Sequence, residues 1–401
     1  MKPKFYRKVL KNGMTLIFEK RRIPVVSVGF AVRQGGINES EHEKGISHFI
    51  EHMLYKGTPT RNAKKIADEI EKRGGELNGF TDECITAFWC KMPSKHLNVA
   101  LDVLGDMVKN PLFDNNELEK ERKVIFEEIK MRKDNPIVYT FDKIQSYLYE
   151  KPFGNSLIGT YETMDSIDKD KILKKFKEVY QPNNLILVVV GDADFEKIVE
   201  FAENNFANTK GKIARQKIVK KNRSGSEIRK GIDQANLVLA YHVPTVNDKK
   251  AYAAKVLSVL MAEGMSSRLF HEIREKRNLA YAVKGESVLN RDYSYNFIYV
   301  GTTKESVDLV KKLILDEFGK VAKELTEKEL KETKDKIIGN YQISMEDSQN
   351  QMVNLLYYET SKNAEDFYKF EKYISAVKLA DVKALAKKAV KDFSFFALLP
   401  R

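Results

Sequence analysis

Two histidines and a glutamate lie close together early in the chain, in the order His48, Phe49, Ile50, Glu51, His52. In a helix, His48 and His52 at positions i and i+4 project from one face, where two imidazoles can reach one ion. Glu51 lies on that face, while Phe49 and Ile50 form an apolar back that would anchor the helix. This inverted His-x-x-Glu-His order favours a zinc site with Glu51 as general base over a surface histidine pair.

A tetrahedral zinc needs a third protein ligand, and a second helix predicted from residue 114 to about 133 supplies candidates. One of its faces carries Glu121, Val124, Ile125, Glu128 and Arg132. Carboxylates on an otherwise apolar stripe are costly unless they are paired or bound to metal. The pattern therefore predicts that the ligand comes from this face.

The neighbouring Glu127 has lysines at positions 120, 123 and 130, a pattern typical of a solvated face with salt bridges. We therefore predict Glu128 as the third ligand. Glu121, two turns earlier, would orient a ligand or the metal water, although an ordinary surface glutamate explains its position nearly as well.

Alternating and helical patterns indicate the elements that would position these residues. An Asn12-Gly13 turn predicts a hairpin, and residues 25–32 a strand. Helices are expected over 43–57, 60–75, 94–109 and 114–133, with a strand pair over 76–93 and a buried strand from 185. The two cysteines, Cys84 and Cys90, lie in the strand pair too far apart to bridge, so we expect free core thiols.

The second half of the chain repeats this order. ELKETKDKIIGNYQ begins at residue 329 and matches ELEKERKVIFEEIK, which begins 212 residues earlier. The repeat predicts an α+β fold of two homologous domains, 1–215 and 216–401, each a mainly antiparallel sheet packed with helices. At this offset Asn340 stands for Glu128, and the second copy lacks the histidine pair. The fold therefore does not need these residues, and chemistry explains them better than packing.

The segments GISHFIEHMLYKGT and ERKVIFEEIKMRKDNP, at this spacing, closely resemble the pitrilysin (insulinase) family of zinc peptidases. The likeness spans essentially the whole chain and is greatest to the branch of about 400 residues that includes mitochondrial processing peptidases and bacterial relatives. It implies that His48, His52 and Glu128 bind one Zn²⁺ per chain. It also implies that Glu51 activates water for peptide hydrolysis.

The resemblance implies two further elements. The family's substrate strand carries an Asn-Ala-x-Thr pattern, and here Asn78, Gly79, Phe80 and Thr81 stand in its place. Glycine at the alanine position would keep the backbone hydrogen bonds but make the edge more flexible.

The segment SSRLFHEIREKRNLAY resembles the family's Arg/Tyr element and implies that Arg274 and Tyr281 donate to the developing oxyanion. From the residues alone, a helix-surface arginine and a core tyrosine would be the more ordinary interpretation of this pair.

Long members of the family close four such domains around the substrate, so a two-domain chain supplies half of the chamber. The resemblance thus implies a homodimer with Arg274 and Tyr281 acting in trans, cleaving unfolded peptides. The sequence does not indicate the substrate, the cleavage preference or a further partner.

The formal charge is +12, but its 69 basic residues are interleaved with 57 acidic ones, which favours solvated helix faces over nucleic-acid binding. We expect no signal peptide and no membrane span, hence a cytoplasmic protein.

The main alternative function is a catalytically inert scaffold subunit, as in the core of a respiratory complex, although such subunits usually have eroded metal motifs.

Overall fold

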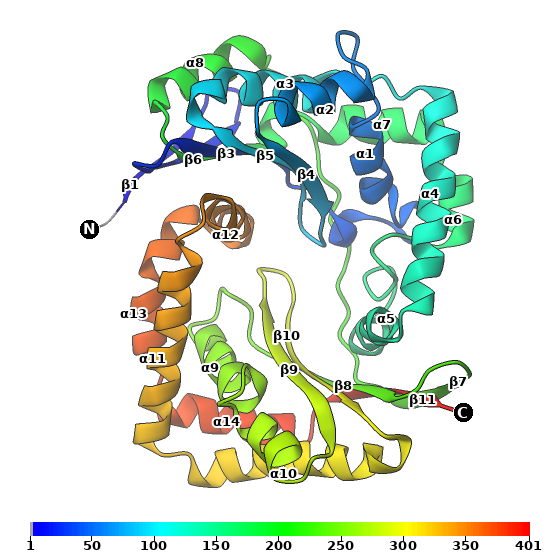
Figure 1. The fold of residues 1–401 in the computed structure, drawn as a ribbon, viewed down its shortest axis with the longest axis vertical. Helices are drawn as coiled ribbons and strands as arrows, with labels where there is room; N and C mark the ends of the chain where they lie inside the picture. Colours follow the sequence, from blue (N-terminus) through cyan, green and yellow to red (C-terminus); the bar gives the residue numbers. More distant parts are fainter. Residues whose placement is uncertain (1–2) are drawn as a thin grey trace. The chain divides into compact units, whose positions relative to one another are not determined.

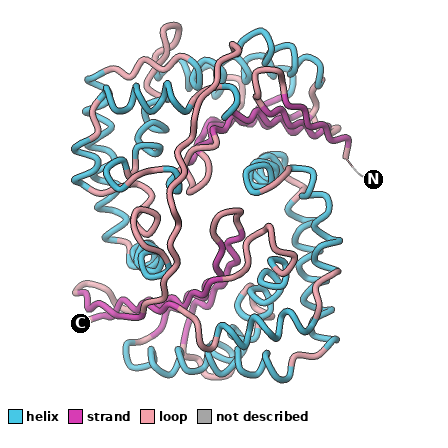
Figure 2. Tube along the Cα trace, turned by 180° about the vertical axis from the view of Figure 1, so that it is seen from behind, coloured by secondary structure: helices cyan, strands magenta, loops and turns pink. Residues whose placement is uncertain are grey.

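The computed structural model describes residues 3–401, which fall into two units. The first unit takes in residues up to 130 with 156–217 and 344–367, and the second takes in 131–155, 218–343 and 368–401. The segment between residues 207 and 223 is mostly loop (Figure 2). The predicted division at residue 215 falls in this loop, but it does not account for 131–155 and 344–367, which belong to the unit of the other half.

The first unit is built on a six-stranded sheet (Figure 1). In order across the sheet, its strands are β1 (Lys4–Val9), β2 (Thr15–Lys20), β6 (Leu185–Gly191), β3 (Val25–Val32), β5 (Thr86–Pro93) and β4 (Glu76–Thr81). All neighbours are antiparallel except β2 and β6. The central strands β3 and β6 are almost wholly buried, as expected for strands covered on both faces.

Helices cover both faces of this sheet. The helices of the first unit are α1 (Ile46–Leu54), α2 (Ala63–Glu71), α3 (Leu97–Lys109), most of α4 (Asn115–Asp134), α6 (Tyr161–Ser166), α7 (Lys169–Val179), α8 (Phe195–Asn205) and α12 (Ser348–Ser361). Helices α1 and α3 contact β5, whereas α12 contacts β3 and β6. Against β3, the sulfur of Met352 fills the space that a side chain at Gly29 would need.

The second unit repeats the arrangement with a five-stranded sheet. Its strands, in order, are β7 (Ser224–Arg229), β11 (Ser394–Pro400), β8 (Ala235–His242), β10 (Ser294–Thr302) and β9 (Ala280–Leu289). Only β7 and β11 are parallel. The order matches β2-β6-β3-β5-β4, so the predicted α+β duplication is confirmed.

The helices of the second unit also follow the repeat. They are α5 (Pro136–Leu148), α9 (Ala251–Ala262), α10 (Val307–Glu324), α11 (Glu327–Ser344), α13 (Phe370–Ser375) and α14 (Leu379–Ala389), with a π-helical segment over Phe270–Glu275. Helix α11 starts 212 residues after α4, as the repeat predicts.

Helices α5 and α12 occupy equivalent places in the repeat but are exchanged between the units. Helix α12 starts 212 residues after α5. Yet α5, from the first half of the chain, packs on β8 and β11, and α12, from the second half, packs on β3 and β6 (Figure 1). Each sheet is therefore covered on one face by a helix from the other half.

Several details differ from the predictions. The helix expected over 43–57 is shorter, because Gly45 adopts a left-handed φ of 94° and α1 begins after it. Cys90 is buried as expected, but Cys84 is only partly buried in the turn between β4 and β5 and so lies outside the core. Among the residues that the structure describes, we find no helix long and apolar enough to cross a bilayer.

Candidate metal centre

Helix α1 is fixed at its N-terminus and along its back. The carboxylate of Glu39 accepts hydrogen bonds from the amides of Gly45 and Ser47 at 2.9 and 2.8 Å. A carboxylate here satisfies amides that the first turn leaves free and complements the helix dipole. Phe49 and Ile50 on the opposite face are fully buried. The helix therefore presents its polar face in one defined orientation.

Helix α4 is held in a similar way. The side chain of Asp114 accepts from the first amides of the helix, those of Asn116 and Glu117. The guanidinium of Arg122 donates to the carbonyls of Met164 and Ile167. Of the face predicted to carry the ligand, Glu121 and Ile125 are buried, whereas Val124 is 49% exposed, so the apolar stripe does not extend to it.

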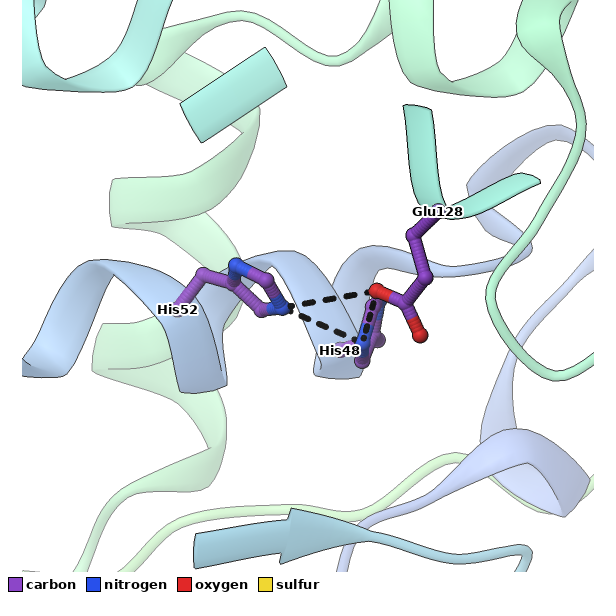
Figure 3. A group of neighbouring side chains, drawn as sticks. All are labelled: His48, His52 and Glu128. Atoms are coloured by element: carbon purple, nitrogen blue, oxygen red, sulfur yellow. Dashed lines mark hydrogen bonds and ion pairs between the residues drawn. The ribbon is translucent and has the colours of Figure 1, made fainter. Parts of the chain in front are cut away.

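His48, His52 and Glu128 converge at the polar face of α1 (Figure 3). Nε2 of His48 lies 3.2 Å from Nε2 of His52 and 3.4 Å from Oε2 of Glu128, and the third separation is 3.8 Å. Donor atoms bound to one tetrahedral zinc at about 2.0–2.1 Å lie about 3.3 Å apart. Two of the three separations match this value and the third is longer, so a small adjustment of the side chains fits them to a zinc ion.

Glu121 contacts His52 on the side of the ring away from the donor cluster. Its Oε2 lies 3.0 Å from Nδ1 of His52, and its Oε1 lies 2.6 Å from Nζ of Lys56. Because a carboxylate can only accept, Nδ1 carries the proton and Nε2 directs its lone pair at the donor cluster. Burial works to raise the pKa of Glu121, but hydrogen bonds from His52 and Lys56 outweigh it and lower the pKa.

Glu51 is anchored at one oxygen. The hydroxyl of Thr81 in β4 donates to Oε2 of Glu51 at 2.6 Å. Burial raises the pKa of Glu51 above its ordinary value, and the Thr81 hydrogen bond opposes part of that rise. A carboxylate fixed by one hydrogen bond and poised to take a proton suits a general base.

The predicted substrate strand, β4, is an edge of the sheet, since among the described residues it pairs with β5 alone. Asn78, Gly79, Phe80 and Thr81 all lie in it. Thr81 faces α1 through Glu51, whereas Phe80 stacks on Tyr357 of α12 with ring centroids 6.1 Å apart.

Gly79 has a steric reason for lacking a side chain. A Cβ built there would collide with the hydroxyl of Tyr55 and lie 2.9 Å from the carbonyl oxygen of Ala87. The Tyr55 hydroxyl is buried and has no hydrogen-bond partner among the described residues. Burial, followed by the nearby charge of Glu51, raises the pKa of Tyr55 well above its ordinary value. Tyr55 thus occupies the space that a side chain at position 79 would need.

Arg274 and Tyr281 lie together in the second unit. The Arg274 guanidinium packs 4.9 Å from the centroid of the Tyr281 ring and donates to the Tyr281 carbonyl at 3.1 Å. Tyr281 is 82% exposed at the start of β9, so the interpretation as a core tyrosine is wrong.

The sequence pattern does not single out Lys56 and Tyr55. Both follow His52 within one turn, and Lys56 is its i+4 neighbour, a spacing that could have marked it. The contact of Tyr55 with Gly79 has no such local signal, because it joins segments distant in sequence.

The fold and the donor cluster together define a duplicated α+β protein with a candidate zinc centre in its first unit. Residues 15–161 match the model of insulinase (peptidase family M16), and residues 166–337 match that of the peptidase M16 inactive domain. A zinc protease of Rickettsia felis, described as uncharacterized, is 32% identical over 95% of this chain and 92% of its own length. The chain therefore belongs to the insulinase family, peptidase family M16.

Solved structures agree on the fold. A protease from Helicobacter pylori superposes with a TM-score of 0.92 at 24% identity, over 99% of this chain and 100% of that one. A peptidase M16 inactive domain from Pseudomonas fluorescens gives 0.89 at 18% identity, over 99% and 98%. At these identities the likenesses show that the fold is shared, and they carry no conclusion about the reaction.

Proposed function

We propose that this protein is a zinc-dependent endopeptidase that hydrolyses unfolded peptides or oligopeptides in a dimeric chamber. The observation that carries the proposal is the convergence of donor atoms from His48, His52 and Glu128, which lie within 4.8 Å of one another. These residues would hold one zinc ion per chain. Membership of a family whose relatives include proteins named zinc proteases supports the same reaction class.

Glu51 would act as the general base. Zinc, when bound, supplies a Lewis acid that polarises a carbonyl and acidifies water. Because Thr81 holds Oε2 of Glu51, Oε1 is the oxygen that takes the proton of the attacking water and returns it to the leaving amine.

The exposed edge of β4 would bind the substrate as an added strand. This mode uses backbone hydrogen bonds and so requires an extended peptide, which would favour unfolded chains as substrates. Arg274 and Tyr281 of a second copy would donate to the developing oxyanion. Their exposure in a separate unit supports a role toward another chain.

A cytoplasmic location belongs to the same proposal. Among the described residues neither cysteine forms a disulfide, which suits a reducing compartment. Cell fractionation with an antibody to the protein would test it.

Peptide hydrolysis by the purified protein tests the function. We expect cleavage of an unstructured fluorogenic peptide that a chelator abolishes, zinc restores and Glu51→Gln removes. Zinc should remain bound to Glu51→Gln at one ion per chain, because this side chain is not a ligand. Zinc binding without cleavage of any peptide library would favour an inert scaffold, and activity that survives both the chelator and the substitution would place the reaction elsewhere.

A further inference from the structure

Lys56 lies immediately beyond α1, one helical turn after His52. Its backbone amide donates to the carbonyl of Met53, so the chain still follows the helix at this point. Its Nζ lies 2.6 Å from Oε1 of Glu121, and 27% of its side chain is exposed. The ammonium group thus reaches inward from the rim of the candidate metal centre.

Glu121 is shared between two residues of one helical turn. Oε1 binds Lys56 and Oε2 binds Nδ1 of His52, while only 9% of the Glu121 side chain is exposed. Two contacts at opposite oxygens fix both the position and the plane of a carboxylate more firmly than either alone. The ring plane of His52 therefore depends indirectly on Lys56.

Glu128 belongs to the donor cluster, whereas Glu121 does not. Both lie on one face of α4, two turns apart. Without Lys56, the Glu121 carboxylate would lose its cation in a buried place, where an unpaired charge is costly. The carboxylate would then be free to turn toward the donor cluster, and this movement would release Nδ1 of His52.

We propose that Lys56 is a positioning residue of the metal centre. By binding Oε1 of Glu121, it holds that carboxylate on His52 and prevents Glu121 from competing with Glu128 as a ligand. This inference rests on the proposed function, because it assumes that zinc binds at His48, His52 and Glu128.

The test measures zinc affinity by competition with a chromophoric chelator at one fixed pH. Substitution of a residue that supports a metal ligand typically lowers the metal affinity by about ten- to a hundredfold. We expect Lys56→Met to weaken zinc binding by at least about tenfold and Lys56→Arg to retain most of it. Lys120→Met is the matched control, since Lys120 forms an ion pair of the same 2.6 Å length with Glu117 on α4, away from the ligands.

A double-mutant cycle separates positioning from a general effect on folding. If Lys56 acts through Glu121, Lys56→Met should weaken zinc binding no further in a Glu121→Gln background. In the cobalt-loaded protein, Lys56→Met should also shift the visible absorption bands, because they report the ligand geometry. If circular dichroism shows that Lys56→Met does not fold, Lys56→Gln is judged by the same criteria.

The outcomes distinguish the two proposals. Unchanged zinc affinity in Lys56→Met, with wild-type protein binding one zinc, overturns the role of Lys56 and leaves the metal centre intact. Equal losses in the wild-type and Glu121→Gln backgrounds also overturn it. Failure of the wild-type protein to bind zinc would remove the proposed function itself.

Discussion

Thr81 holds Glu51 through a hydrogen bond of 2.6 Å that joins the edge strand β4 to the metal-site helix α1. Hydrogen bonds to charged groups contribute about 1.5–3 kcal/mol. We expect Thr81→Val to lower kcat/KM by about ten- to a hundredfold while zinc content stays at the wild-type level. Thr81→Ser keeps the hydroxyl and should lose much less. Equal activity of the valine and serine variants would show that the contact does not position the base.

The contact between Gly79 and Tyr55 predicts a compensating pair. Gly79→Ala should weaken substrate binding and raise KM, because the new methyl collides with the Tyr55 hydroxyl. Tyr55→Phe removes that oxygen and should restore part of the loss. Recovery should be incomplete, since the Ala87 carbonyl is also close. Steady-state kinetics of both single variants and the double variant provide the measurement, and strictly additive effects would contradict the pairing.

Removal of a ligand should separate metal binding from folding. Glu128→Gln is expected to abolish zinc binding at micromolar zinc and, with it, the rise in Tm that zinc gives the wild-type protein. The adjacent Glu127→Gln is the matched control, because Glu127 is exposed and pairs only loosely with Lys130 at 3.9 Å. A zinc-dependent rise in Tm that persists in Glu128→Gln would exclude Glu128 as a ligand.

Action in trans predicts complementation between two inactive variants. Glu51→Gln lacks the base and Arg274→Ala lacks the oxyanion donor, so each alone should be inactive. If Arg274 serves the site of a second chain, mixed dimers contain one site with both groups intact. Co-expressed and co-purified chains with different tags should then recover a fraction of the wild-type rate. Mixed dimers without activity would contradict the arrangement.

Asp106 predicts a pH dependence of stability outside the metal centre. Burial works to raise its pKa, but hydrogen bonds from Asn110, Thr58, Thr60 and Arg61 outweigh this and lower the pKa to about 2. A lowered pKa in the folded state stabilises the fold above the unfolded value of about 3.9, and this stability is lost as the pH falls toward 2.

Thermal unfolding at a series of pH values tests this expectation. Asp106→Asn should lower Tm by several degrees at neutral pH, and the difference from wild type should shrink between pH 4 and pH 2. Asp316→Asn, at an exposed position of α10, is the control and should leave Tm nearly unchanged. A difference that persists unchanged down to pH 2 would mean that the Asp106 charge does not stabilise the fold.

Periodicity was sufficient to predict the donor cluster but not its surroundings. His48 and His52 share a helix face by spacing alone, and Glu128 stands out as a carboxylate beside buried apolar residues. The hydrogen bond from Thr81 to Glu51 and the space filled by Tyr55 depend on how β4 packs against α1, which no local pattern encodes. Val124 shares this face by spacing but is half exposed, because the buried stripe of α4 is narrower than the helical period suggests.

The repeat likewise predicted the sheets but could not assign every helix. Sequence likeness identifies α5 and α12 as equivalent elements. This likeness would be the same whichever sheet each helix covered. Only the three-dimensional structure therefore reveals the exchange.

Because of this exchange, the stability of each half of the chain depends on the other half. A protein cut near residue 215 would yield one fragment without the cover of β3 and β6 and another without the cover of β8 and β11. Neither fragment could shield its own sheet from water, so each would be prone to aggregate unless the other were present. Each half is therefore expected to fold only together with the other, and a destabilising substitution in α5 weakens the half to which this helix does not belong by sequence.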